Sequence, residues 1–198
     1  MRLWSTLVRE RLDLSEGDPD MTRKNSFTLL KRANQVKTRL YEIGLELDAL
    51  VKDNNLVTHI PSMCLTDLVL EMLELRDSTV AVVLCYHAMY SIIVHRILWS
   101  IINDDSFYKS ELEFEILCLS RKIWELVEHG RRYQPLGLPI LSVALSMTLE
   151  SVSWEAQNEI TTLVNELESV QGLKSASWTT EKLIHLAMVY RGDRAADI

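Results

Sequence analysis

Two histidines are the residues of this chain whose side chains could most readily do chemistry. His87 and His95 lie in the apolar stretch Ser78–Ile102, STVAVVLCYHAMYSIIVHRILWSII. A helical histidine pair that binds a metal stands four residues apart on one face. Here the spacing is eight residues, which turns a helix about 80° beyond two full turns, and no Glu-x-x-His motif is present. The spacing therefore favours two histidines held in a core or an interface.

An acidic run, Asn103-Asp104-Asp105, follows this stretch and invites comparison with the magnesium motifs of helical terpene synthases. Such a motif places Ser four residues after the Asn and Glu eight residues after it. Glu111 stands at the second of these positions, but Phe107 occupies the first. A second Asp-rich motif is also missing. We therefore expect the run to end one helix and to cap the next.

The other reactive residue types indicate no reaction. The chain has no Gly-x-Ser-x-Gly elbow and no glycine-rich phosphate loop. Its cysteines, Cys64, Cys85 and Cys118, are far apart, form no CxxC pair and sit among apolar residues. They predict buried reduced thiols, which suit the cytosol or nucleus, and neither a zinc site nor disulfides. We nominate no catalytic, cofactor-binding or metal-ligating residue and expect no cofactor.

The composition is that of one globular domain. Of 198 residues, 47% are hydrophobic and 25% are charged, with six Gly and four Pro. The net charge of −7 argues against direct nucleic-acid binding, which needs a basic surface. Basic residues occur in short groups such as Arg131-Arg132, and together with Tyr133 these are better read as a solvated loop than as an interaction surface. The amphipathic N-terminus is not typical of a secretory signal.

The elements that must position these residues are helices. Apolar residues recur every three or four positions through most of the chain, and no strand alternation is evident. The pattern predicts an all-α single-domain bundle of about seven helices around a buried central apolar helix. The expected segments are a short helix before Gly17, 26–52 with Ser26 as N-cap, a short helix within 64–76, 78–102, 107–129, 138–149, 154–172 and 179–190. Residues 1–25 are expected to be a short helix and linker, 26–190 the helical domain, and 191–198 a polar tail.

The apolar stretch allows three interpretations: a membrane span, a catalytic helix or the central helix of a core. A span needs about 20 apolar residues without strong charge. Only fifteen uncharged positions, Val80 to Val94, precede His95-Arg96, and an arginine inside the hydrocarbon costs several kcal/mol. We therefore favour the core helix, with Arg96 near its end and paired with a carboxylate or a carbonyl.

The order of these features resembles the fungal-specific transcription-factor domain. Ala81–Leu98 resembles its central helix, and Ile116–Gly130 resembles the helix whose Cys/Ser-Arg element precedes a loop marked by Pro and Gly. Gln134–Glu150 is similar to the segment where that loop leads into an apolar helix, and Trp154–Gly172 to the short amphipathic helix after it. The resemblance covers roughly residues 26–172 and contains no catalytic motif.

Members of that family usually carry six closely spaced cysteines that form a zinc cluster, and this chain has none. The family's DNA recognition therefore does not carry over. The resemblance implies a non-enzymatic, nuclear, regulatory helical domain that acts through a protein partner or a small effector. One alternative is a helical enzyme or metabolite-binding protein of a secondary pathway, with His87, His95 or Asp104 in its pocket. Another is a membrane-associated helical protein.

Overall fold

A long apolar helix, α3 (Ser78–Ile101), lies at the centre of the fold. In this computed structural model, the described residues are 2–14, 19–53, 55–62, 65, 68–102, 106–132, 138–170 and 177–193. Asp77 caps α3, because its carboxylate accepts a hydrogen bond of 2.7 Å from the Thr79 amide. Side chains on several faces of α3 are buried, from Ala81 to Leu98. The predicted all-α class with a buried central apolar helix is confirmed.

Helix α3 is long and apolar enough to cross a membrane by length and composition, and 56% of its most apolar window is buried inside the fold. Ile92, Ile93 and Ile97 are each no more than 1% exposed. The helix therefore uses its apolar faces to pack against other helices of the same chain, as a core helix does.

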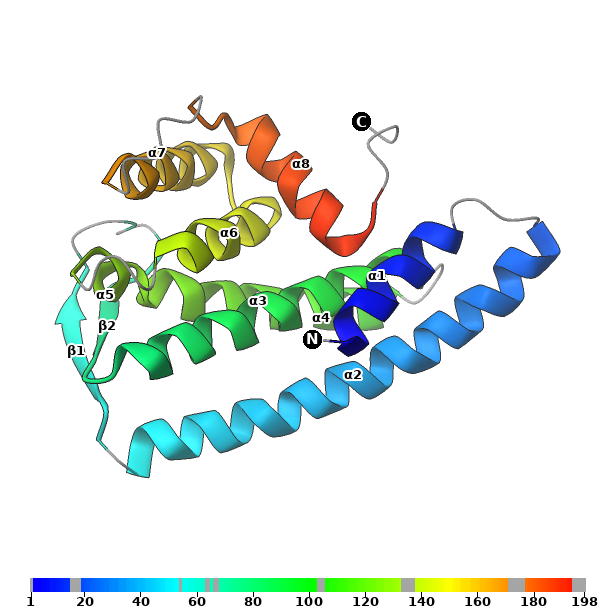
Figure 1. Cartoon of the computed structure of the whole chain (residues 1–198), viewed down its shortest axis with the longest axis horizontal. Helices are drawn as coiled ribbons and strands as arrows, with labels where there is room; N and C mark the ends of the chain where they lie inside the picture. Colours follow the sequence, from blue (N-terminus) through cyan, green and yellow to red (C-terminus); the bar gives the residue numbers. More distant parts are fainter. Residues whose placement is uncertain are drawn as a thin grey trace.

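Two helices flank α3 on one side. Helix α2 (Pro19–Asp53) and helix α4 (Ser106–Glu125) both pack against it, and α2 runs along the lower edge of the molecule in Figure 1. The chain reverses direction between α3 and α4, so α4 runs parallel to α2. Side chains bridge the two parallel helices, because the Tyr108 hydroxyl donates to Oδ1 of Asn34 over 3.1 Å.

The opposite side of α3 is covered by α6 (Leu138–Thr148) and α8 (Thr180–Arg191), with α7 (Trp154–Val170) packed on α6 (Figure 1). The predicted helices 138–149, 154–172 and 179–190 are confirmed over their described residues. Thr179 caps α8 by accepting from the Lys182 amide. A 3₁₀ turn, Leu149–Ser151, joins α6 to α7.

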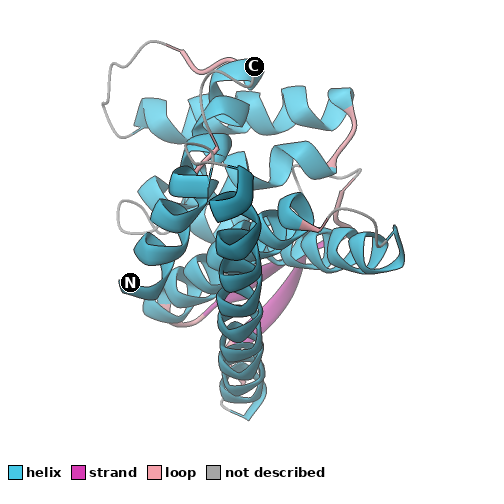
Figure 2. Cartoon of the chain, turned by 90° about the vertical axis from the view of Figure 1, so that its right-hand side faces the viewer, coloured by secondary structure: helices cyan, strands magenta, loops and turns pink. Residues whose placement is uncertain are grey.

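The structure also contains a strand pair that the sequence pattern did not predict. Strands β1 (Val57–Pro61) and β2 (Glu71–Leu75) pair antiparallel, with Val57 opposite Leu75. Figure 2 shows these strands against an otherwise helical chain. The expectation of a helix within 64–76 was therefore wrong. Met72 and Leu75 fall on opposite faces of β2 and are both buried, so a short strand buries these apolar residues as a helix would.

Two predicted helix limits were also wrong. Helix α2 begins at Pro19, so Ser26 lies inside it and is no N-cap. Proline suits the first turn of a helix because its missing N–H would have no partner there. The expected helix 107–129 is divided at Leu126 into α4 and the short α5 (Val127–Arg132). Residues 103–105, the predicted cap, lie outside the described residues.

Helix α1 (Arg2–Leu14) belongs to the same packed body as the rest. It packs on α2, and its Leu7 is 2% exposed within the core. Gly192, at the end of α8, has a φ of +81°, and a Cβ there would lie 2.7 Å from the carbonyl oxygen of Val8. Glycine therefore permits both the left-handed end of α8 and the close approach of α1.

Candidate functional site

A groove of about 250 Å³ lies between α2 and α4. Its floor is formed by α3, which presents His87, Ser91 and His95. Its walls come from side chains of α2 and α4, which include Leu40 and Leu119. The groove exists because α2 and α4 each pack on α3 and leave a channel between them, which their longer side chains only partly bridge.

An ion pair closes each end of this groove. Nζ of Lys37 contacts Oε2 of Glu115 at one end. At the other end, Nζ of Lys122 lies 3.0 Å from Oδ1 of Asp48. Lys37 and Asp48 are eleven residues apart on α2, so the groove between the pairs is about 16 Å long at 1.5 Å per residue. A continuous partner helix would have to break both pairs to lie along it.

Large apolar side chains line the groove and remain exposed. Tyr41 is 66% exposed, Leu45 54% and Phe114 67%. Single exposed apolar residues are common on protein surfaces, but a group around one concave site marks a place where a ligand can be bound. None of the three lies on the buried stripe of its helix, which is the one signal in the sequence that could have identified them.

His95 is held in the floor by both of its ring nitrogens. Nδ1 donates to the Ser91 carbonyl oxygen over 2.6 Å, and Nε2 lies 2.7 Å from Oε2 of Glu115. Burial lowers the pKa of His95, against the opposing effects of the Ser91 carbonyl and the Glu115 carboxylate. For Glu115, burial alone would raise the pKa, but Lys37 and His95 outweigh it and lower the pKa. Neither nitrogen of His95 remains available to bind a metal or to accept a proton from a substrate.

His87 is fixed by α2. Its Nε2 donates to the carbonyl oxygen of Leu40 over 2.7 Å, since a carbonyl can only accept. The ring lies directly against Gly44, where a Cβ would come within 2.9 Å of Cε1 of His87. The glycine is therefore needed for the close approach of the imidazole to the α2 backbone.

The structure thus brings both predicted histidines into one site, although their spacing on α3 places them on different parts of the helix. The two side chains leave α3 in different directions, and the groove is wide enough for both to line it. Asp104 lies outside the described residues, and Glu111 is exposed on α4 and does not line the groove. Within the described part of the chain, no group of three or more His, Cys, Asp or Glu side chains is arranged to hold a metal ion.

The cysteines differ from the prediction of three buried thiols. Cys85 is buried, and burial raises its pKa to about 12, so it stays a protonated thiol at neutral pH. Cys118 is instead exposed and lines the groove. It precedes Leu119 on α4, one position away from the buried stripe. Cys64 lies outside the described residues.

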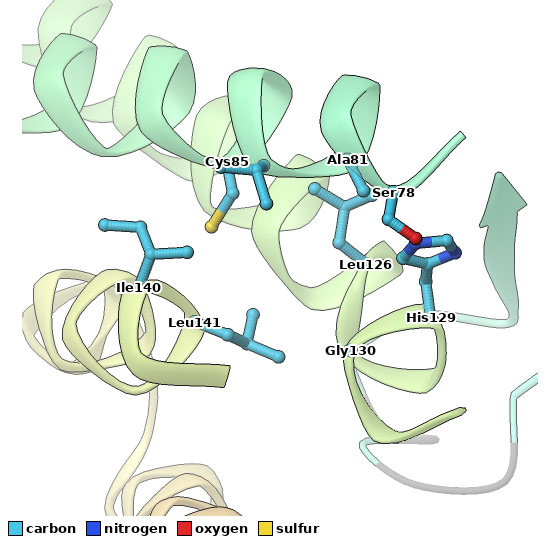
Figure 3. A pocket seen from close by; sticks show the side chains of 9 residues that line it. Ser78, Ala81, Cys85, Leu126, His129, Gly130, Ile140 and Leu141 are labelled. Atoms are coloured by element: carbon cyan, nitrogen blue, oxygen red, sulfur yellow. The ribbon is translucent and has the colours of Figure 1, made fainter. Parts of the chain in front are cut away.

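A second, much smaller cavity of about 20 Å³ lies at the other end of α3. Figure 3 shows Cys85 and Ala81 from α3 facing Ile140 and Leu141 across it, with His129 at one side. The volume is that of about one water molecule. This cavity is a packing gap in the core and is too small for a ligand.

Two other predicted residues have structural partners. The Arg96 guanidinium donates from Nη2 to Oγ of Ser151 over 2.9 Å, and its Nε lies 3.6 Å from Oε2 of Glu150. The prediction of a carboxylate partner is confirmed. The expectation of a solvated loop at Arg131-Arg132 was wrong, because both residues belong to helix α5, and Arg131 pairs with Glu128 and Glu166. The side chain of Arg132 and the whole of Tyr133 lie outside the described residues.

The groove also depends on residues that no sequence motif singled out, above all Lys37, Glu115 and Phe114. Comparison with family models, with curated proteins and with solved structures gave no significant match to this chain.

Proposed function

We propose that this chain is a non-enzymatic regulatory domain that binds an elongated apolar small molecule in the groove between α2 and α4. The observation that carries the proposal is the group of exposed side chains, Tyr41, Leu45 and Phe114, around one groove that has polar residues in its floor and an ion pair at each end. Such a site buries apolar surface at about 25 cal/mol per Å². Its few polar groups orient the ligand.

The engagement of the histidines supports a binding role over catalysis. Both nitrogens of His95 and Nε2 of His87 already hold the groove together. A general base must instead be free to reach a substrate proton. The closed ends of the groove favour a small effector over a protein helix, which would have to displace Lys37 and Lys122 from their carboxylates.

A fluorescent label on Cys118 tests this proposal, because that thiol is exposed inside the groove and Cys85 is buried. A Cys64→Ser background restricts labelling to Cys118. We expect straight-chain alcohols and fatty acids of about ten carbons to shift the emission of an attached bimane to shorter wavelength, because they would displace water from its surroundings.

A pair of variants on α2 supplies the control. Leu45→Glu places a charge in the groove and should weaken binding at least tenfold. Leu50→Glu lies on the same helix beyond the Asp48–Lys122 pair, is also exposed, and should leave binding unchanged. An emission that no apolar compound changes, or an equal loss in both variants, would contradict the proposal.

We further propose that the domain works in the nucleus as the regulatory part of a fungal-type transcription factor, without contacting DNA itself. The order of apolar helices that resembles that family and the acidic net charge of −7 support this. Mapping the 5′ end of the transcript tests it. Six closely spaced cysteine codons upstream of Met1 in one reading frame are the expected result, and a start at Met1 without a companion DNA-binding chain would count against it.

A further inference from the structure

Another pocket, of about 440 Å³ and distinct from both the groove and the small core cavity, lies on the opposite flank of α4 from the groove. It is formed where the last turns of α3 and the first half of α4 meet the 3₁₀ turn at residues 149–151. Phe114 is the one described residue that lines both sites. The lining residues are Arg96, Ser110, Glu113, Phe114, Leu117, Glu150 and Ser151.

Arg96 supplies a buried positive charge to this pocket. Its side chain is only 15% exposed, and among the described residues its buried Nε makes no hydrogen bond. Glu150 only partly compensates the positive charge of Arg96. The same Oε2 that lies 3.6 Å from Nε of Arg96 also accepts a hydrogen bond from Arg191. A guanidinium has five donors in a planar fork that fits a carboxylate. Only the bond to Ser151 uses that fork here among the described residues.

Glu113 supplies a negative charge at the same pocket. Its Oε1 accepts a hydrogen bond of 3.1 Å from Nε1 of Trp99, which fixes the carboxylate on an exposed part of α4. Burial lowers the pKa of Arg96, and the carboxylates of Glu150 and, to a smaller extent, Glu113 oppose this effect. Glu150 also lines the pocket and pairs with Arg191, so beside that pair the pocket presents Arg96 as a cation and Glu113 as an anion.

The remaining wall is apolar. Phe114 is 67% exposed and Leu117 38% exposed, so the ring of Phe114 and the branched end of Leu117 stand at the surface, where a bound molecule can cover them. A ligand that matches all three features must carry a carboxylate, an ammonium group and an apolar side chain.

We propose that this pocket binds a free apolar amino acid. The carboxylate bonds the Arg96 fork beside Ser151, the ammonium pairs with Glu113, and the side chain packs on Phe114 and Leu117. The proposal is independent of the groove, whose charged residues are all different. It gives the chain a second ligand of different chemistry, bound on the other side of the same helix.

Isothermal titration calorimetry with L-phenylalanine and L-leucine tests this site. We expect both to bind the full chain. Two analogues of phenylalanine separate its charges, since 2-phenylethylamine lacks the carboxylate and 3-phenylpropanoate lacks the ammonium. Each should bind at least tenfold more weakly than L-phenylalanine, because 2-phenylethylamine has no carboxylate for Arg96 to bind and 3-phenylpropanoate has no ammonium group for Glu113 to bind.

Matched variants locate the site. Arg96→Lys and Glu113→Gln should each weaken L-phenylalanine binding at least tenfold. Glu111→Gln on the same helix, outside the pocket, and Leu45→Glu in the groove should leave it unchanged. If Arg96→Lys does not fold, Ser151→Ala reports on the same carboxylate contact and should weaken binding severalfold.

Three results would overturn the proposal. The first is no binding of either amino acid at millimolar concentration. The second is binding of 3-phenylpropanoate as tight as that of L-phenylalanine, which would remove any role for Glu113. The third is a loss of binding in Leu45→Glu with none in Glu113→Gln, which would place the amino acid in the groove.

Discussion

At the scale of single residues, the buried His129 couples the stability of the fold to pH. The Leu75 amide donates to Nδ1 of His129 over 3.2 Å, so the neutral ring carries its proton on Nε2. Burial lowers the pKa of His129, and the Glu74 carboxylate opposes this effect. A protonated His129 would place an N–H against the Leu75 N–H, so the fold favours the neutral form.

The sign of the resulting pH dependence follows from this direction. Between the lowered pKa of His129 in the fold and the ordinary value of about 6.5, the unfolded chain binds more protons than the folded chain. The free energy of unfolding should therefore decrease as the pH falls below about 6.5, by up to about 1.4 kcal/mol per pH unit for this histidine. Urea unfolding at pH 7.5, 6.5 and 5.5 measures this decrease.

His129→Asn should make the decrease smaller. The asparagine Oδ1 can accept from the Leu75 amide in place of Nδ1, but the side chain does not titrate. His59→Asn is the matched control, because the side chain of His59 is 64% exposed. Equal effects of the two substitutions on the pH slope would show that burial of His129 is not the cause.

At the scale of elements, α3 carries the core. Its side chains contact α2, α4, α6 and α8 together, so a cavity at its centre cannot be closed by the shift of one neighbour. Ile93 is 1% exposed, whereas Val83, on the same helix, is 41% exposed.

Ile93→Ala should therefore lower the free energy of unfolding by about 2–5 kcal/mol, through lost burial and the cavity left behind. Val83→Ala should lower it by less than about 1 kcal/mol. Chemical denaturation of both variants provides the measurement. Similar losses at the two positions would be incompatible with α3 as the central core helix.

The elements that the sequence failed to predict are those that depend on a distant partner. Val57–Pro61 is too short to show a convincing alternation, and it becomes a strand by pairing with Glu71–Leu75. Met72 and Leu75 are three residues apart, which suits one face of a helix, whereas in β2 they fall on opposite faces of the strand and are both buried. Burial of the same two residues is satisfied either way, so only the pairing decides.

At the scale of the whole molecule, an ion-pair cluster joins the two ends of the described chain. Nε and Nη2 of Arg11 in α1 donate to Oδ1 of Asp193 over 3.3 and 3.1 Å, and Arg191 also contacts Asp193. Arg191 also forms an ion pair with Glu150, and Glu150 pairs in turn with Arg96 of α3. The cluster thus connects α1, α3, the 3₁₀ turn and α8.

Asp193→Ala should lower the free energy of unfolding by roughly 2 kcal/mol or more, because it leaves two part-buried arginines short of a carboxylate. The Asp193 side chain is 11% exposed. Asp48→Ala breaks an ion pair whose carboxylate is 57% exposed, and should cost less than about 1 kcal/mol. Thermal unfolding of both variants compares the two. A smaller loss for Asp193→Ala would mean that the cluster does not stabilise the fold.

The sequence by itself determined the helical class, the central position of α3 and the limits of α6, α7 and α8. These are local properties, because the period of apolar residues states which face of a helix must be buried. It could not state which neighbouring face each helix meets. Lys37 meets Glu115, and Arg96 meets Glu150, only after the chain has reversed direction. The groove with His87 and His95 and the pocket beside Arg96 are therefore products of tertiary packing alone.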